Sequence, residues 1–334
     1  MKGSSNRGWL ALDVGAKKHA WASRINDQYA HGSVTNDPAQ LRAFLKRCLK
    51  KTTHLQVLVE ATGVYYLDVA IIAYELGAQV MVINPRAAHH FAKALHQRSK
   101  TDKLDAQMLL ECLMRMPFQA WEPPPKAWRQ LRSYGRFLVQ LTETGTADRN
   151  RLHALLHTPD SPAFLRTELK RKIRTNDQRI ERVRAQAIAL IQADDYLRVR
   201  FQSLRTIKGV ADTAAVSLLS ELVTVPPTLS SRACASHAGL DVRLFESGTS
   251  VHKAARISKH GNKYLRRALY HPAMSAATHD PGARAFKERL IGRGKKKMQA
   301  NVAIMRKMLT AAWAIMKDPQ PYDSSRLYAD LDKA

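Results

Sequence analysis

The first hundred residues alternate short apolar runs with amphipathic segments, and this pattern restricts this part of the chain to an α/β fold. Residues 9–14, 55–59 and 79–83 are largely apolar runs of strand length, each followed by a turn or a helix-starting residue. Residues 37–49 and 62–76 repeat their apolar side chains at helical spacing. Two short strands are expected directly after the first run, so the predicted order is β-β-β-α-β-α-β followed by a helix. This order predicts a mixed α/β sheet domain.

Three consecutive prolines at 123–125 cannot continue a helix or a central strand, and they predict a domain boundary. After them, leucines at a spacing of three and four predict a long helical region in which Gly145 and Asp148 interrupt the apolar stripe. Beyond residue 204, shorter helices and loops replace this pattern. We therefore expect three parts, residues 1–124, 125–200 and 201–334.

A heptad pattern marks the second half of this helical connector. Apolar residues alternate by four and three from Leu169 to Leu190, and Asn176 is the one polar member. About three heptads are compatible with an antiparallel helical hairpin within one chain and with a dimerising coiled coil. The sequence leaves both alternatives open.

Residues 204–219 predict two helices joined by a tight turn around Gly209, in the manner of a helix-hairpin-helix. Such a turn exposes backbone N–H groups that can hold a phosphate. Ala211 stands where a second glycine is usual, so a simple turn between two helices is an equal alternative.

Positive charge is in large excess: 54 Lys and Arg face 28 Asp and Glu, a net charge of +26. Residues 251–310 alone hold 15 Lys and Arg and two acids, so half of the excess lies in under a fifth of the chain. Such a concentration indicates a surface that binds a polyanion, and nucleic acid is the expected partner. The expected phosphate contacts are Lys253, Arg256, Lys259, Lys263, Arg266 and Arg267. Arg266 and Arg267 could equally form a solvated helix face.

The sequence shows no membrane or secretion signal. No uncharged apolar run approaches the roughly 18 residues that a bilayer crossing needs, and no apolar core follows the N-terminal charges. Three widely spaced cysteines, Cys48, Cys112 and Cys234, fit no metal-ligand spacing. A cytoplasmic protein with reduced thiols and no membrane partner is the simplest interpretation.

Four carboxylates stand out by position. Asp13 ends the first predicted strand, Glu60 ends the apolar run 55–59, and Asp102 and Asp105 share one face at the start of a helix. Two bare carboxylates about 4 Å apart repel by roughly 4 kcal/mol at an effective dielectric of about 20, so four that converge need a cation. Mg²⁺ prefers oxygen ligands and can hold a phosphodiester for displacement. The alternative is that these acids are loop and helix caps.

A series of short motifs runs along the chain. The first half carries LDVG at 12–15, VEATGVY at 59–65, VINP at 82–85 and KTDKLDA at 100–106. The second half carries IKGV at 207–210, AGL at 238–240, FESGTS at 245–250, ISKHGN at 257–262 and LRRAL at 265–269. In order and spacing these motifs resemble the DEDD transposases of bacterial insertion sequences, and the resemblance covers nearly the whole chain.

This resemblance implies a RuvC-like (RNase H-like) catalytic domain over residues 1–124, a coiled-coil connector over 125–200 and a mainly α transposase domain over 201–334. It implies a recombinase guided by a structured non-coding bridge RNA, acting on donor and target double-stranded DNA as a homo-oligomer (dimer to tetramer) in the bacterial cytoplasm. By position, Mg²⁺ (or Mn²⁺) would be bound by Asp13, Glu60, Asp102 and Asp105. Ser247 would be the nucleophile that forms a covalent phosphoserine with a DNA strand, in a composite site with the carboxylates.

A serine hydroxyl is a weak nucleophile and needs a base or a metal to remove its proton, which a metal-carboxylate cluster could provide. Without the resemblance, Ser247 followed by glycine is typical of a turn, and Thr249 and Ser250 are rival hydroxyls. Two other functions stay open. One is a structure-specific nuclease that uses water as its nucleophile, and the other is a non-enzymatic basic nucleic-acid-binding protein.

Overall fold

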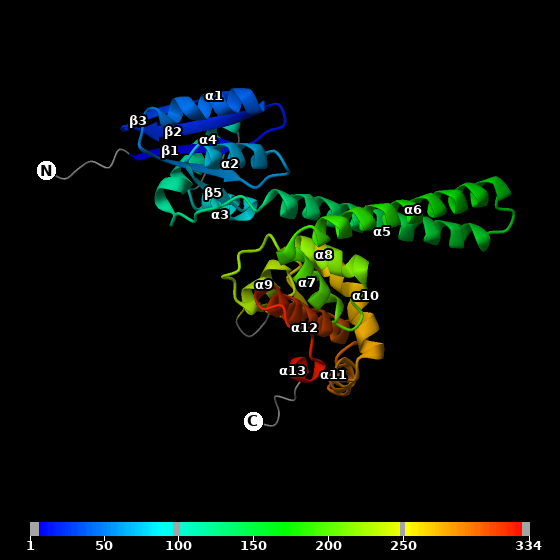
Figure 1. Cartoon of the computed structure of the whole chain (residues 1–334). Coiled ribbons are helices and arrows are strands. Elements are labelled where there is room, and N and C mark those ends of the chain that lie inside the picture. The colour runs from blue at the N-terminus through cyan, green and yellow to red at the C-terminus, as the bar shows by residue number, and fades with distance from the viewer. Residues whose placement is uncertain (1–6, 96–100, 248–250, 329–334) are drawn as a thin grey trace. The chain divides into compact units, whose positions relative to one another are not determined.

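The structure is a computed structural model that describes residues 7–95, 101–247 and 251–328. The chain forms two compact units, Met1–Pro123 and Pro124–Ala334, and they divide within the proline run that predicted a boundary (Figure 1). The helical connector belongs to the second unit, and the finer division into three parts stays a prediction. In the described ranges, no helix is both long and apolar enough to cross a membrane.

The first unit is built on a five-stranded sheet with the strand order β3-β2-β1-β4-β5. β1 pairs antiparallel with β2 and parallel with β4; β2 and β3 are antiparallel, and β4 and β5 are parallel. The strands are β1 (Arg7–Asp13), β2 (Lys18–Ile25), β3 (Gln28–Thr35), β4 (His54–Glu60) and β5 (Gln79–Ile83). The predicted mixed sheet is confirmed, with strand ends that differ by a few residues.

Helices cover both faces of this sheet (Figure 1). They are α1 (Pro38–Leu49), α2 (Tyr66–Glu75), α3 (Pro85–Ala94) and α4 (Asp102–Arg115). Leu12 and Val57 share the apolar cluster that contains the buried residues of α1 and α2. Ala11 and Leu58 belong instead to the cluster formed with α3 and α4. Because side chains alternate along a strand, each sheet residue is assigned to one of these two layers.

Two helices of the first unit begin as the sequence indicates. The Asp37 side chain accepts a hydrogen bond from the Gln40 N–H at 2.9 Å, and Pro38 is the first residue of α1. Asn84 accepts from the Arg86 N–H at 2.9 Å in the same way, ahead of Pro85 in α3. An N-cap followed by proline satisfies an N–H group that the helix leaves unpaired and fixes the direction of its first turn.

The second unit contains a long helical hairpin and a mainly helical body. The hairpin helices are α5 (Lys126–Leu156) and α6 (Ala163–Gln192). The body contains α7 (Asp195–Arg205), α8 (Asp212–Leu222), α9 (Ser231–His237), α10 (Lys263–His279), α11 (Pro281–Gly292), α12 (Lys297–Lys317) and α13 (Ser324–Leu327). A two-stranded antiparallel hairpin, β6 (Val242–Ser247) and β7 (Val251–Ile257), lies between α9 and α10. A mixed N-terminal region followed by a mostly helical remainder agrees with the prediction, whereas the RuvC-like and helix-hairpin-helix assignments stay predictions.

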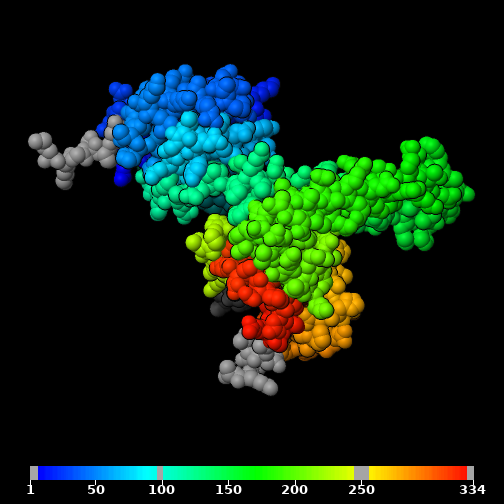
Figure 2. Space-filling model, in the orientation of Figure 1, coloured from blue at the N-terminus to red at the C-terminus, as the bar shows by residue number. Residues whose placement is uncertain are grey.

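The hairpin of α5 and α6 extends away from the other helices of its unit (Figures 1 and 2). Gly145 and Asp148, which interrupt the predicted apolar stripe of α5, lie where α5 contacts α6. Asp148 is fully buried and pairs with Arg151 at 2.6 Å and Lys172 at 3.0 Å. A Cβ on Gly145 would lie 2.9 Å from Nδ2 of Asn176, so the glycine allows close approach.

Asn176 donates a hydrogen bond from Nδ2 to the backbone oxygen of Leu141 at 2.9 Å. The polar member of the heptad pattern therefore serves a contact within the chain, and of the two alternatives the structure shows the intrachain hairpin. Pairing of hairpins between chains stays a prediction.

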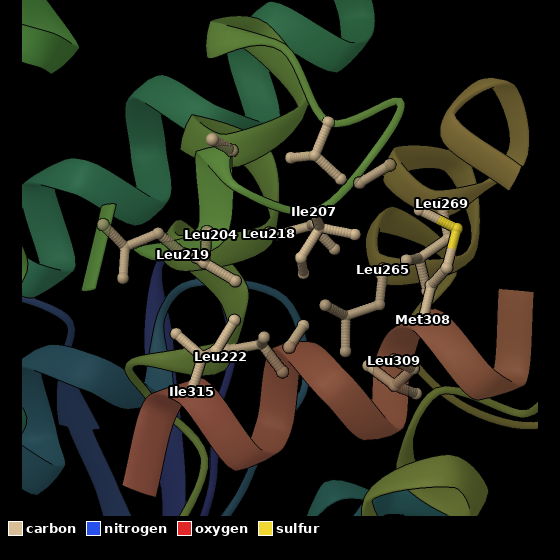
Figure 3. Packing of buried hydrophobic residues seen from close by; sticks show 14 of the residues in the cluster. Leu204, Ile207, Leu218, Leu219, Leu222, Leu265, Leu269, Met308, Leu309 and Ile315 are labelled. Atoms are coloured by element: carbon tan, nitrogen blue, oxygen red, sulfur yellow. The ribbon is translucent and has the colours of Figure 1, made fainter. Parts of the chain in front are cut away.

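The core of the second unit surrounds α8, in which every residue from Ala215 to Leu222 is buried. Figure 3 shows Leu218, Leu219 and Leu222 of α8 in one apolar cluster with side chains of α10 and α12. α12 packs through Met305, Leu309, Ala312 and Met316, all of which are buried.

Gly209 lies in the turn between α7 and α8 with a φ of +90°. A Cβ at this position would lie 2.5 Å from the backbone oxygen of Pro272 in α10. The glycine is needed for this turn because a side chain would meet the backbone of α10 and strain its own conformation. The helix-hairpin-helix and simple-turn alternatives for residues 204–219 both stay predictions.

Candidate functional site

The carboxyl ends of β1 and β4 bring Asp13 and Glu60 to one edge of the sheet. Leu12 pairs with Val59 in the parallel register, so the next residue on each strand is one of these two acids. Asp13 is also two residues beyond Ala11, and Glu60 is two beyond Leu58, and both of these apolar residues are buried on the α4 side. By alternation, the two carboxylates therefore emerge on the face that α4 covers.

The other two predicted ligands lie in the first turn of α4. Thr101 caps the helix by accepting from the Leu104 N–H at 3.2 Å, and Asp102 and Asp105 follow. Four-residue steps from them reach Ala106 and Leu109, which are buried against the sheet. Two strands and one helix thus direct all four predicted acids toward one layer of the first unit.

The side chains themselves do not form a closed cluster. Glu60 is half-buried and accepts from the Thr62 hydroxyl at 2.7 Å, while Asp102 is exposed. Within the described ranges, no three His, Cys, Asp or Glu side chains are grouped closely enough to hold an ion. The donor chemistry and the strand framework fit a hard cation, but the carboxylates would have to turn toward one another to bind it.

Ser247 lies in the second unit as the last residue of β6, where it pairs with Val251 of β7. Its side chain and that of Lys253 lie outside the described part of the structure, as do residues 248–250, which include the rival hydroxyls Thr249 and Ser250. The nucleophile assignment stays a prediction. The backbone shows that the residue stands at the far end of a hairpin and not within a helix.

Backbone hydrogen bonds join the AGL and ISKHGN motifs at the base of the β6–β7 hairpin. The Lys259 N–H donates to Gly239 O at 3.1 Å, and the Asn262 N–H donates to His237 O at 2.7 Å. Gly261 has a φ of +148°, and a Cβ there would lie 2.2 Å from His237 O. The segments 238–240 and 257–262 can approach this closely only because glycine occupies the contact. The contact between these two segments fixes where β6 begins and where β7 ends.

A buried acid that the sequence analysis missed ties this base to the helices. Glu221 of α8 is 1% exposed and accepts hydrogen bonds from Arg136 Nε at 2.6 Å, Arg132 Nε at 3.2 Å and Asn262 Nδ2 at 2.6 Å. Burial alone would raise the pKa of Glu221, but the hydrogen bond and charge of Arg136 and the charge of Arg132 outweigh it and lower the pKa. An acid inside the apolar run 214–223 was the available signal.

Asn262 connects the same network to α10. Its Oδ1 accepts from the N–H groups of Tyr264 at 2.9 Å and Leu265 at 3.2 Å, so it is the N-cap of the helix. The pKa of nearby His237 is lowered, because its ring is partly withdrawn from water and faces Arg132. The hydrogen bonds of Glu221 and Asn262 therefore link the base of the β6–β7 hairpin to α8 and α10.

The predicted phosphate-binding residues divide into two groups. Arg256, Lys259 and Lys263 are exposed. Arg266 is half-buried, its pKa is lowered by burial, and its Nη1 donates to Ala238 O at 2.7 Å. Arg267 is exposed and pairs with Glu143 at 2.7 Å. The Arg266 side chain is therefore engaged in packing against the AGL motif. The side chains of Arg256, Lys259 and Lys263 are exposed to solvent.

Comparison with known proteins defines the class of enzyme. Residues 10–158 match a family model described as transposase, for the DEDD domain of IS110 elements, and residues 201–288 match one described as transposase of the IS116/IS110/IS902 family. Enzymes of this class cleave and rejoin DNA.

The pilin gene-inverting proteins of Moraxella lacunata and Moraxella bovis are each 30% identical to the chain over 273 residues, which is 81% of this chain and 83% of each relative. The insertion element IS110 uncharacterized 43.6 kDa protein of Streptomyces coelicolor is 30% identical over 150 residues, 45% of this chain and 36% of that protein. The chain belongs to the IS110 family of transposases.

Proposed function

We propose that this transposase is a bridge-RNA-guided, metal-dependent recombinase that exchanges DNA strands through a phosphoserine at Ser247. The Moraxella relatives are named for gene inversion, and inverting a DNA segment requires strands to be both cut and rejoined. A covalent enzyme–DNA link conserves the energy of the phosphodiester, so rejoining needs no further cofactor.

The parallel register of β1 and β4 is the observation that carries the metal-dependent part. It places Asp13 and Glu60 on one edge and on the face covered by α4, whose first turn holds Asp102 and Asp105. Mg²⁺ bound by these four carboxylates would stabilise negative charge on the scissile phosphate and favour loss of the serine proton. The acids alone would repel both one another and the DNA.

In the proposed step, Ser247 Oγ attacks the phosphorus of the scissile phosphodiester. The Oγ–P bond forms and the bond from phosphorus to the leaving deoxyribose oxygen breaks; the serine loses its proton and the leaving oxygen gains one. Attack by the corresponding oxygen of a second DNA strand reverses these changes and releases the serine. The number of phosphodiester bonds is the same before and after exchange.

Guidance by RNA fits the charge of the protein. Base pairing with a guide RNA would select the donor and target DNA, so the protein need bind only backbone and helical shape. The net charge of +26 and the exposed Arg256, Lys259 and Lys263 support binding of two nucleic acids at once. Exchange between two duplexes also requires more than one active site, so we propose a homo-oligomer.

Strand exchange by purified variants tests the proposal. Donor and target duplexes are incubated with the protein, the RNA transcribed from the flank of its own reading frame, and Mg²⁺. We expect Ser247→Ala and Asp102→Asn to abolish exchange, and Ser250→Ala, the matched control, to retain it. Exchange by Ser247→Ala would overturn the serine assignment, and exchange by Asp102→Asn would remove that carboxylate from the site.

A structure-specific nuclease with water as the nucleophile gives a different result in the same assay. Such an enzyme would still cut DNA as the Ser247→Ala variant and would leave no product joined to protein. A non-enzymatic binding protein would cut nothing in any form. Each outcome contradicts the proposal in its own way.

A further inference from the structure

The outer face of α3 carries a stripe of cationic and imidazole side chains that none of the sequence motifs includes. Arg86, His89, His90 and Lys93 are all exposed and follow one another at steps of three, one and three residues. On a helix these positions share one side. The opposite side, with Ala88 buried and Phe91 and Ala92 partly buried, packs into the cluster formed with α4.

This helix begins at the carboxylate edge of the sheet. Glu60 pairs with Ile83 at the end of β5, and the Ala61 N–H donates to Ile83 O at 2.9 Å. Asn84 and Pro85 follow immediately and start α3. The first charge of the stripe, Arg86, is therefore three residues beyond the residue that is paired with Glu60.

The loop after Glu60 borders the same edge and exposes apolar side chains. Val64 is 67% exposed and Tyr65 is 42% exposed, directly before α2. Gly63, with a φ of +63°, allows the chain to turn there. Tyr65 follows the end of β4 by five residues and Arg86 follows the end of β5 by three, and these two strand ends are paired. Exposed aromatic rings together with cationic side chains are the combination that binds a nucleic-acid strand, because bases stack on the rings and phosphates pair with the charges.

We propose that this surface, defined as the α3 stripe with Val64 and Tyr65, holds the DNA strand that is presented to the carboxylate edge. Arg86 and Lys93 bind its phosphates, His89 and His90 donate hydrogen bonds to it, and Tyr65 stacks on a base. This inference rests on the proposed function, in which the carboxylates act on a DNA phosphate. It adds a DNA-binding surface outside the basic region 251–310.

Salt dependence of DNA binding tests the phosphate contacts. Binding of a single-stranded DNA oligonucleotide by the full chain is measured in a chelator, so that no strand exchange occurs, between about 50 and 200 mM salt. For the double variant Arg86→Gln/Lys93→Gln, two lost contacts lower the slope of log K against log salt by about 1.4. The matched control is Lys46→Gln/Arg47→Gln, which removes two exposed charges from α1 on the other face of the sheet.

The slope for the α1 control should equal that of the parent protein. Equal slopes for the α3 variant and the parent would overturn the proposal. So would a loss confined to an RNA oligonucleotide of the same sequence, since the surface would then hold RNA.

A fluorescent base analogue in the same oligonucleotide tests stacking on Tyr65. We expect quenching on binding, lost in Tyr65→Ala and retained in Tyr65→Phe, with affinity of Tyr65→Ala reduced by about 10-fold or more. Tyr74 near the far end of α2, 40% exposed, provides the control: Tyr74→Ala should leave quenching and affinity unchanged. Equal loss in both alanine variants, or none in either, would contradict a specific stacking role.

These readouts separate this inference from the proposed function. Binding is measured without divalent metal and without any requirement for Ser247. If the protein does not exchange strands, the Arg86→Gln/Lys93→Gln variant can still show the lower salt slope. If the protein is an active recombinase, that variant can still bind DNA with the slope of the parent.

Discussion

Replacing Glu221 by glutamine removes the buried negative charge at the junction of α5, α8 and α10. The carboxylate is 1% exposed and accepts four hydrogen bonds, three from Arg132 and Arg136 and one from Asn262. Removing one partner of a buried ion pair costs about 3–5 kcal/mol, because the other charge stays buried and unpaired. Both arginine side chains are about a third exposed, so water can compensate in part. We therefore expect a loss of about 3 kcal/mol in the free energy of unfolding.

Urea unfolding followed by circular dichroism measures this loss, and hydrogen exchange of the α8 amides assigns it to the second unit. Glu143→Gln is the matched control, since Glu143 is 40% exposed in its pair with Arg267 and should contribute under about 1 kcal/mol. Equal and small effects of the two substitutions would refute the reasoning that the Glu221 network holds the base of the hairpin.

The pH dependence of stability gives an independent check on Glu221. Its pKa is lowered from the ordinary 4.5 in the folded protein, so the folded state prefers the charged form. The resulting stabilisation is present above the unfolded pKa and is lost as the pH falls through the lower folded pKa. The Glu221→Gln variant should therefore lose less stability than the parent on acidification below about pH 4.5. Parallel pH curves for the two proteins would contradict the assignment.

Three further predictions concern packing. Gly135→Ala should destabilise the second unit by about 1–3 kcal/mol, because its Cβ would lie 2.0 Å from Ser220 Oγ; adding Ser220→Gly should restore part of the loss in urea unfolding. Asn176→Ala should cost about 1–2 kcal/mol by removing the buried hydrogen bond to Leu141, and no shift of the melting temperature would oppose this. Cys234 is 1% exposed and burial raises its pKa to about 11, so a thiol reagent at neutral pH should label it only in urea, and rapid labelling of the native protein would contradict its burial.

Local rules were sufficient to predict the first unit from its sequence. Continuous apolar runs marked β1, β4 and β5, and Asp37 with Pro38 marked the start of α1. Each of these signals depends on a few adjacent residues. The parallel register of β1 with β4 puts the strand ends that carry Asp13 and Glu60 next to each other, while their role as metal ligands stays a prediction.

Contacts between distant segments were harder to anticipate. Gly145 and Asp148 looked like breaks in an apolar stripe, yet they are the positions where α5 meets Asn176 and Lys172 of α6. Glu221 is a single acidic residue in an apolar run, and its hydrogen-bond partners lie 41 to 89 residues away in the sequence. No local pattern encodes such partners, because tertiary packing alone decides whether a buried charge is compensated.

The basic region shows the same difficulty. A charge count predicts phosphate binding for Arg266 as readily as for Lys263, but the structure directs Arg266 to the backbone oxygen of Ala238. In the α3 stripe, by contrast, only two of the four members carry a formal charge, so a charge count does not single it out. Net charge predicts the class of partner, whereas the individual contact residues stay predictions.

Metal-directed cleavage of the backbone tests most directly whether the four carboxylates gather around one cation. Fe²⁺ is bound to the full-length protein in place of Mg²⁺, and ascorbate with peroxide generates radicals that cut the chain near the ion. We predict cuts close to residues 13, 60 and 102, suppressed by excess Mg²⁺ and by Asp13→Asn. Cuts confined to other parts of the chain, or cuts at these three places that persist in Asp13→Asn, would contradict a shared metal site at the carboxylate edge.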